Sequence, residues 1–341
     1  MKKRKIFLWC SVLVAGIIIL LAYFGYSLLG HQFKNTETAY IYIDTDDNID
    51  SVRSKIIQEA SPSNLAAFDM IVSVYKLDKD LRTGRYAIAP DASVLDIIRN
   101  IRNHHQSPIM LVIPSVRTVE DLAGRISHKL MIDSTDIASA LKNEDVCKSL
   151  GYTTATVSAM FIPNTYEVWW DMSVDEFLSR MKRENNTFWN AERTKKADEM
   201  GMTKEEIVTL ASIVDEETAN NGEKPRIAGL YLNRLKTDMP LQSDPTVKYA
   251  LGNFALRRIL NVHLNVESPY NTYRVNGLPP GPIRIPSIAG IDAVLNHEHH
   301  NYLYMCAKED FSGTHNFAST YSQHLSNARK YAAALNARGI R

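Results

Sequence analysis

The stretch TKEEIVTLASIVDEET, residues 203–218, predicts a helix that carries a carboxylic acid at its end. Thr203, followed three residues later by Glu206, forms a capping-box sequence typical of a helix N-terminus. Apolar residues then recur at the spacing of one helix face, namely Ile207, Leu210, Ala211 and Val214. We therefore expect an amphipathic helix with one buried stripe.

The three acids that end this stretch differ in their expected direction. At about 100° per residue, Glu217 lies within roughly 20° of Leu210 on the apolar face. Glu216 points to the opposite face and Asp215 to one flank. Burial, the charge of Asp215 and the helix dipole should all raise the pKa of Glu217. A protonated carboxyl there can act as a general acid on a glycosidic oxygen, and the alternative is a solvated helix end.

The N-terminus predicts a membrane anchor. Four basic residues, 2–5 (KKRK), precede an uncharged apolar run at residues 6–29. At 1.5 Å per residue this run can cross the roughly 30 Å hydrocarbon core. It is too long for the core of a cleaved signal peptide, so we expect one uncleaved span, with a buried globular helix as the alternative. By the positive-inside rule the N-terminus is cytoplasmic, and residues from about His31 onward lie in the periplasm, outside the inner membrane.

The charge balance of the remaining chain argues against nucleic acid as a partner. The sequence has 39 Lys and Arg against 38 Asp and Glu. Without the four basic residues of the anchor, 39 − 4 = 35 basic residues face 38 acidic ones, so the rest of the chain has a formal net charge of −3. The broad cationic surface typical of nucleic-acid-binding proteins is therefore not expected.

Metal and disulfide patterns are weak. The cluster at residues 297–300 (HEHH) lacks the spacing of a zinc motif, so we expect a solvated helix end and no metal or cofactor. Outside the apolar run, the cysteines are Cys147 and Cys306. They could pair in an oxidising compartment, and the sequence leaves that open.

The order of predicted elements indicates an α+β protein in three parts. Residues 1–30 form the anchor. Residues 31–107 form a small α+β module, with strands at 39–43 and 84–88 and helices around Val52 and Ile56, over 64–77 and from Ser93. Residues 108–341 form a larger α+β domain that starts with a strand at 109–113 and a helix capped by Thr118.

Polar and aromatic side chains cluster downstream of the Glu217 helix. Pro225 can open a second helix, which carries Arg234 on its polar side. The following segments, 241–249 (LQSDPTVKY) and 268–273 (SPYNTY), mix rings with amides, hydroxyls and an acid. Rings stack on sugar C–H faces, and amide or guanidinium groups bind hydroxyl and N-acetyl groups. The predicted sugar-binding residues are Arg234, Gln242, Asp244, Tyr270, Asn271 and Tyr273.

Taken in order, these segments resemble the endolytic murein transglycosylase family, also called YceG-like. The segments that carry the resemblance are 211–218 (ASIVDEET), 233–235 (NRL), 241–247 (LQSDPTV), 270–273 (YNTY), 277–281 (GLPPG) and 315–317 (HNF). The resemblance covers nearly the whole chain, because the anchor and a module resembling the family's LysM-like subdomain come in the same order. The family's catalytic glutamate precedes a Thr and maps onto Glu217, while Asp215 stands where the family often has Glu.

The resemblance implies cleavage of the β-1,4 bond between N-acetylmuramic acid and N-acetylglucosamine within nascent peptidoglycan strands. The muramic acid 6-hydroxyl closes on its own C1, which gives a 1,6-anhydro end and terminates glycan elongation. Glu217 donates the proton to the leaving oxygen and its carboxylate then takes the 6-hydroxyl proton. His315 belongs to the matching 315–317 segment and is expected to bind substrate or support Glu217, with a structural role as the alternative. Peptidoglycan synthases are implied as neighbours.

Two other functions remain open at this point. Asp244 could serve as a second carboxylate in a muramidase that uses water. Alternatively, the chain could be a membrane-tethered scaffold that binds peptidoglycan without cleaving it.

Overall fold

The computed structural model describes residues 2–30, 32–256 and 258–339, and side chains from residue 9 onward. The predicted module boundary at His31 and the basic side chains of residues 2–5 lie outside that description. The chain forms two compact units. The first comprises Met1–Leu111, Lys129–Met131 and Tyr166–Met172, and the second comprises Val112–His128, Ile132–Thr165 and Ser173–Arg341. The division into 1–30, 31–107 and 108–341 remains a prediction.

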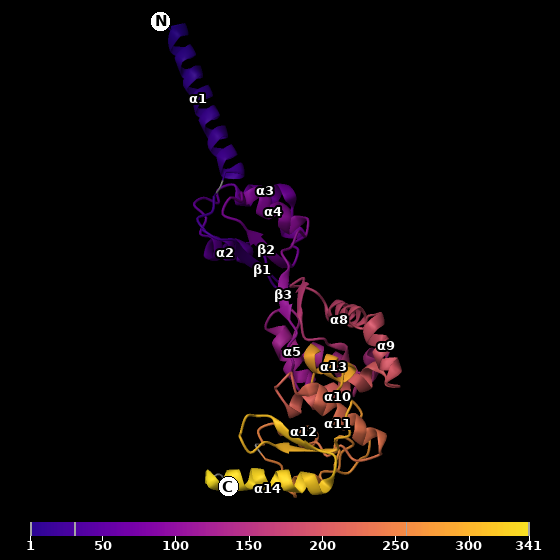
Figure 1. Cartoon of the computed structure of the whole chain (residues 1–341). Helices are drawn as coiled ribbons and strands as arrows, with labels where there is room; N and C mark the ends of the chain where they lie inside the picture. Colours follow the sequence, from indigo (N-terminus) through magenta and orange to yellow (C-terminus); the bar gives the residue numbers. More distant parts are fainter. Residues whose placement is uncertain (1, 31, 257, 340–341) are drawn as a thin grey trace. The chain divides into compact units, whose positions relative to one another are not determined.

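The first unit begins with a long apolar helix, α1 (Lys2–Leu29) (Figure 1). Its segment Trp9–Leu29 has a mean hydropathy of 2.4 and is almost entirely unburied. Among the described residues it is the one helix long and apolar enough to cross a membrane. Near its end, Phe24 and Leu28 pack against the core of the small module, so the helix is joined to the module by apolar contacts as well as by the chain.

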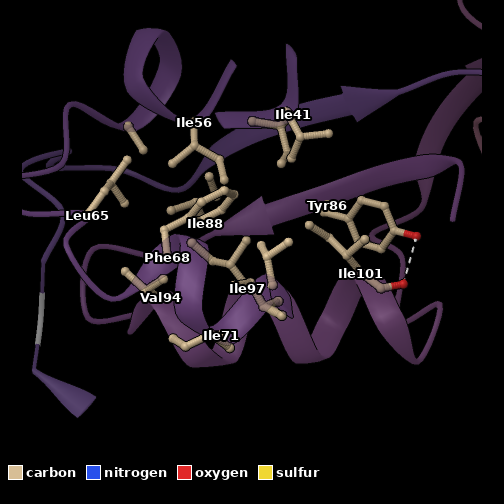
Figure 2. Close-up of a cluster of buried hydrophobic side chains, with 14 of the residues drawn as sticks. Ile41, Ile56, Leu65, Phe68, Ile71, Tyr86, Ile88, Val94, Ile97 and Ile101 are labelled. Carbon is tan, nitrogen blue, oxygen red and sulfur yellow. Dashed lines mark hydrogen bonds between the residues drawn. The ribbon is translucent and has the colours of Figure 1, made fainter. Parts of the chain in front are cut away.

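The small module is a two-stranded sheet covered by helices. Its elements are β1 (Ala39–Ile43), α2 (Ile49–Ala60), α3 (Phe68–Tyr75), the 3₁₀ helix η1 (Leu77–Lys79), β2 (Gly84–Ile88) and α4 (Val94–Arg102). The strands are antiparallel, with Ile41 opposite Tyr86. Alternate residues point inward, as a half-buried strand requires, and they pack on Ile97 and Ile101 of α4 (Figure 2). The expected α+β composition is thus confirmed here.

One predicted helix of this module is shorter than expected. The pattern at residues 64–77 suggested a single helix, but α3 begins only at Phe68. The Asn64 side chain accepts the backbone N–H of Ala66 at 2.7 Å. Such a local side-chain bond favours a turn over a helix.

The second unit is mostly helical. Its strands β5 (Tyr304–Ala307) and β6 (His315–Ala318) pair antiparallel. Strands β3 (Ile109–Val112) and β4 (Thr165–Val168) also pair with each other, and most of their residues belong to the first unit. The helices are α5 (Val119–Ser127), α6 (Ser134–Lys142), α7 (Glu144–Ser149), η2 (Val157–Met160), α8 (Val174–Phe188), α9 (Ala191–Glu199), α10 (Lys204–Glu217), α11 (Lys224–Lys236), α12 (Asp244–Leu251), η3 (His263–Asn265), α13 (Ile288–Leu295) and α14 (Tyr321–Ala337).

Helix α10 forms the centre of this unit. Its capping box is present as predicted, with the Thr203 hydroxyl accepting the N–H of Glu206. The expectation of a single buried stripe is wrong, because every residue from 207 to 214 is buried. Helices α9, α11, α12 and α13 all pack on α10, so apolar neighbours surround it on more than one side. The buried polar residue Ser212 fits there because its hydroxyl donates to the Thr209 carbonyl and accepts the N–H of Ile283.

The cysteines of the second unit are unpaired. The buried Cys147 thiol donates to the carbonyl of Leu141 at 3.3 Å. Cys306 lies on β5 and is also a free thiol.

Candidate active site

A cleft of about 220 Å³ opens at the C-terminal end of α10. The residues that line it are Glu217, Leu230, Tyr231, Arg234, Gln242, Asp244, Tyr273, Met305, Cys306, Ala307 and His315. They come from the end of α10, the middle of α11, the start of α12 with the residues before it, the loop after η3 that carries Tyr273, and the β5–β6 hairpin (Figure 1). Residues up to 315 − 217 = 98 positions apart in sequence therefore meet around one carboxyl group.

The carboxyl of Glu217 is held by two hydroxyl groups. Its Oε1 accepts the phenol of Tyr231 at 2.7 Å and the hydroxyl of Ser243 at 2.5 Å. Tyr231 and Ser243 are themselves buried, so both donors are fixed in place. With two donors on Oε1, Oε2 is the oxygen left to exchange a proton with a molecule in the cleft.

Burial is the main reason why the pKa of Glu217 is raised above its usual value. Hydrogen bonds from Ser243 and Tyr231 and the charge of His315 act in the opposite direction, and the charge of Asp244 raises the pKa further. The sequence correctly predicted that burial raises the pKa of Glu217. The neighbouring negative charge that raises this pKa is that of Asp244, where the sequence predicted Asp215. The alternative of a solvated helix end is wrong, because the carboxyl of Glu217 is buried.

The two acids before Glu217 are structural. Asp215 forms an ion pair with Lys224 at 2.7 Å, and these side chains are only 4% and 7% exposed. The same carboxylate accepts the backbone N–H of Ser287 at 2.6 Å. Glu216 binds Arg117 and Arg284. The expectation that only Glu217 would point inward is therefore wrong, because ion pairs allow the other two acids to be buried as well.

Asp244 and Tyr273 form one wall of the cleft. The phenol of Tyr273 donates to Oδ1 of Asp244 at 2.7 Å, and burial raises the pKa of Tyr273. Gln242 lies beside them with φ of 50°, a left-handed conformation that costs energy for a residue with a side chain. Its N–H donates to the Thr272 carbonyl at 3.0 Å, which holds the conformation. This places Gln242 among the lining residues although its backbone is strained.

Arg234 lines the cleft, and its guanidinium donates hydrogen bonds to backbone carbonyls. Nε donates to the Leu303 carbonyl at 2.7 Å and Nη1 to the Leu241 carbonyl at 2.6 Å. Burial lowers its pKa. Arg234 thus connects the residue before β5 to the segment before α12, in addition to facing the cleft.

Tyr270 and Asn271 are not brought into the cleft. The Tyr270 ring packs on Tyr249 at 4.8 Å between centroids, and burial raises the pKa of Tyr270 to about 12. The Asn271 side chain is 0% exposed and donates to the carbonyls of Leu264 and Val266. Its Oδ1 accepts the N–H of Tyr273. In this structure Asn271 shapes the loop that presents Tyr273.

Comparison with known proteins identifies the family of this chain. The sequence profile of the YceG-like family matches residues 41–330. The chain belongs to the YceG-like family. A Bacillus subtilis protein named endolytic murein transglycosylase is 34% identical over 167 residues, which cover 49% of this chain and 45% of that protein. A protein of the same name from Streptococcus pneumoniae is 27% identical over 327 residues, covering 84% of this chain and 58% of that protein.

The chain thus spans about half the length of these curated YceG-like relatives. A crystal structure of a YceG-like protein from Listeria monocytogenes superposes with a TM-score of 0.58 at 26% identity. The match covers 86% of this chain and 99% of that one.

Three residues around Glu217 and His315 are not among those predicted from the sequence: Tyr231, Ser243 and Glu223. Ser243 lies in the run at 241–247, which is a signal that could have found it. Nothing in the sequence marks Tyr231 or Glu223.

The histidine cluster at residues 297–300 has other partners. His300 lies 2.9 Å from the carbonyl of Arg226, and Glu298 forms an ion pair with Arg226. Within the part of the chain that the structure describes, no group of three His, Cys, Asp or Glu side chains is arranged to hold a metal ion.

Proposed function

We propose that this chain is an endolytic murein transglycosylase that cleaves peptidoglycan strands internally and leaves 1,6-anhydro ends. The observation that carries the proposal is the carboxyl of Glu217, which opens onto a polar cleft with its pKa raised by burial. A carboxyl whose pKa is raised by burial keeps its proton to higher pH and can protonate a leaving sugar oxygen. The names of the relatives support the same activity.

In the proposed reaction, Glu217 gives the proton on Oε2 to the oxygen that links N-acetylmuramic acid to N-acetylglucosamine. The bond from C1 to that oxygen breaks, and the 6-hydroxyl of the same muramic acid closes on C1. The 2-acetamido group of the substrate can stabilise the positive charge at C1. One carboxyl then suffices, because the Glu217 carboxylate can take back the proton of the 6-hydroxyl.

The other lining residues would bind the sugars. Gln242, Asp244, Tyr273, Arg234 and His315 share the cleft with Glu217. Their amide, carboxylate and ring groups suit hydroxyl and N-acetyl groups. We assign Tyr270 and Asn271 a supporting place behind Tyr273.

We further propose that α1 anchors the protein in the inner membrane, with the N-terminus in the cytoplasm and the rest in the periplasm. Nascent glycan is made on that side, so the cleft would meet strands beside the peptidoglycan synthases and terminate their elongation. Residues 31–107 would act as a LysM-like subdomain and residues 108–341 as the catalytic domain. The apolar length of Trp9–Leu29 supports the anchor.

Analysis of the products tests the proposal against both alternatives. The full-length protein in detergent should digest purified sacculi to muropeptides whose muramic acid end resists borohydride reduction. A reducible muramic acid end would indicate the water-using muramidase instead. The Glu217→Gln variant should digest sacculi at least about 10² times more slowly than the wild type. If neither the wild type nor this variant digests sacculi, the non-catalytic scaffold is favoured.

A further inference from the structure

A buried acid outside the cleft holds one of the cleft side chains. Glu223 lies at the start of α11 but makes no capping bond to that helix. Its Oε1 accepts the backbone N–H of His315 at 2.8 Å, and its Oε2 lies 2.9 Å from the ring Nδ1. The side chains of Glu223 and His315 are 7% and 17% exposed. Both carboxylate oxygens of Glu223 thus form hydrogen bonds to one histidine, 92 residues away in sequence.

This geometry determines how the imidazole is presented. A carboxylate only accepts hydrogen bonds, so Nδ1 of His315 must carry a proton. The other nitrogen, Nε2, is then an acceptor whenever the ring is neutral. Among the described residues, Nε2 has no hydrogen bond to protein, and His315 lines the same cleft as Glu217.

We propose that Glu223 is a positioning residue that fixes His315 as the proton acceptor for the attacking 6-hydroxyl. The inference rests on the proposed function and changes which group first takes that proton. A carboxylate that orients an imidazole and stabilises its protonated form is a recurring device for activating hydroxyl groups. Glu217 and His315 also act on each other electrostatically, because the positive charge of the ring favours the carboxylate left after proton donation.

The step balances as follows. Glu217 gives its proton to the departing oxygen as the bond from C1 breaks, and the 6-hydroxyl oxygen forms the new bond to C1. The hydroxyl proton moves to Nε2 of His315, and the imidazolium lies against the carboxylate of Glu223. The ring then returns a proton to the Glu217 carboxylate, so both groups end the turnover as they began. No oxidant, metal or added water is consumed.

The test combines kinetics with ring-nitrogen shifts of isotopically labelled histidine in the full-length protein. His315→Gln keeps a polar side chain but cannot accept a proton, so kcat should fall by at least about 10² with KM within about twofold. Glu223→Gln should lower kcat at least about tenfold, because the ring is no longer held in one tautomer. Glu223→Asp, which restores the charge, should recover part of that loss.

The labelled spectra separate positioning from folding. The His315 signal, identified by its loss in His315→Gln, should show the Nδ1–H form in the wild type and a changed tautomer balance in Glu223→Gln. The control is Glu309→Gln, which changes a partly exposed acid that accepts a hydrogen bond from Asn316, the neighbour of His315 on β6. It should leave both kcat and the His315 signal unchanged.

Three results would overturn the inference while leaving the proposed function intact. They are wild-type kcat in His315→Gln, wild-type kcat in Glu223→Gln, and an Nε2–H form in the wild type. In each case the wild type would still release anhydro ends. Reducible ends from the wild type would instead refute the proposed function itself.

Discussion

The ion pair between Asp215 and Lys224 provides a quantitative test of how the end of α10 is held. Its two charged atoms are 2.7 Å apart and almost fully buried. Removing one partner leaves the other charge in an apolar interior, which typically costs about 3–5 kcal/mol. We expect Asp215→Asn to lose about that much stability, although the amide still offers an oxygen to the N–H of Ser287.

The double variant makes this prediction sharper. Asp215→Asn combined with Lys224→Met leaves no buried charge, so it should cost clearly less than the sum of the single changes. We expect a coupling energy of about 2 kcal/mol or more, within the range for residues in contact. Because α10 and α11 carry Glu217 and Tyr231, the single variants should also lose activity.

Native-state hydrogen exchange of α10 peptides at increasing urea measures the opening free energy of the second unit alone. This choice avoids assuming that the two units unfold together. Surface variant Lys195→Ala, which breaks an exposed pair with Glu199, serves as the control and should change stability by less than about 1 kcal/mol. Single variants that cost under about 1 kcal/mol, or a double variant equal to their sum, would refute the reasoning.

Three further predictions follow from the site and its supports. Tyr231→Phe removes a hydrogen bond that lowers the pKa of Glu217, so the alkaline limb of the pH–rate profile should move to higher pH, and a shift to lower pH would contradict this. Because the raised pKa of Glu217 means that the folded state resists its ionisation, the contribution of Glu217 to stability should fall as pH rises above about 4.5, so Glu217→Gln should melt higher than wild type at alkaline pH but not well below 4.5. A Cβ on Gly281 would lie 1.9 Å from the Ala155 carbonyl oxygen, so Gly281→Ala should lower the melting temperature measurably; an unchanged value would show that this close approach relaxes freely.

Local signals in the sequence predicted much of the fold. The capping box at Thr203, the cap at Ser93 and the proline near the start of α11 each set a helix boundary through contacts within four residues. Strand β1 was predicted at its observed bounds because Ile41 and Ile43 alternate with tyrosines. Such features depend on neighbours in sequence, which a single chain displays directly.

The site was only partly predictable, for a physical reason. Helical periodicity gives the direction of Glu217, which lines the cleft, yet the same periodicity does not show that α10 is buried on several sides. The partners Tyr231, Ser243 and Glu223 lie on other elements, and only the packed structure brings them together. Asn271 was misplaced for the same reason, because its amide was already used by loop carbonyls.

The most direct test of the central claim is digestion of sacculi in water enriched in the heavy oxygen isotope, with mass spectrometry of the released muropeptides. If Glu217 protonates the leaving oxygen and the 6-hydroxyl closes the ring, the new ends from the wild type will be one water lighter than hydrolysed ends and carry no heavy oxygen. Glu217→Gln will release almost none of them. Heavy oxygen at C1 of muramic acid, or undiminished anhydro products from Glu217→Gln, would contradict the account.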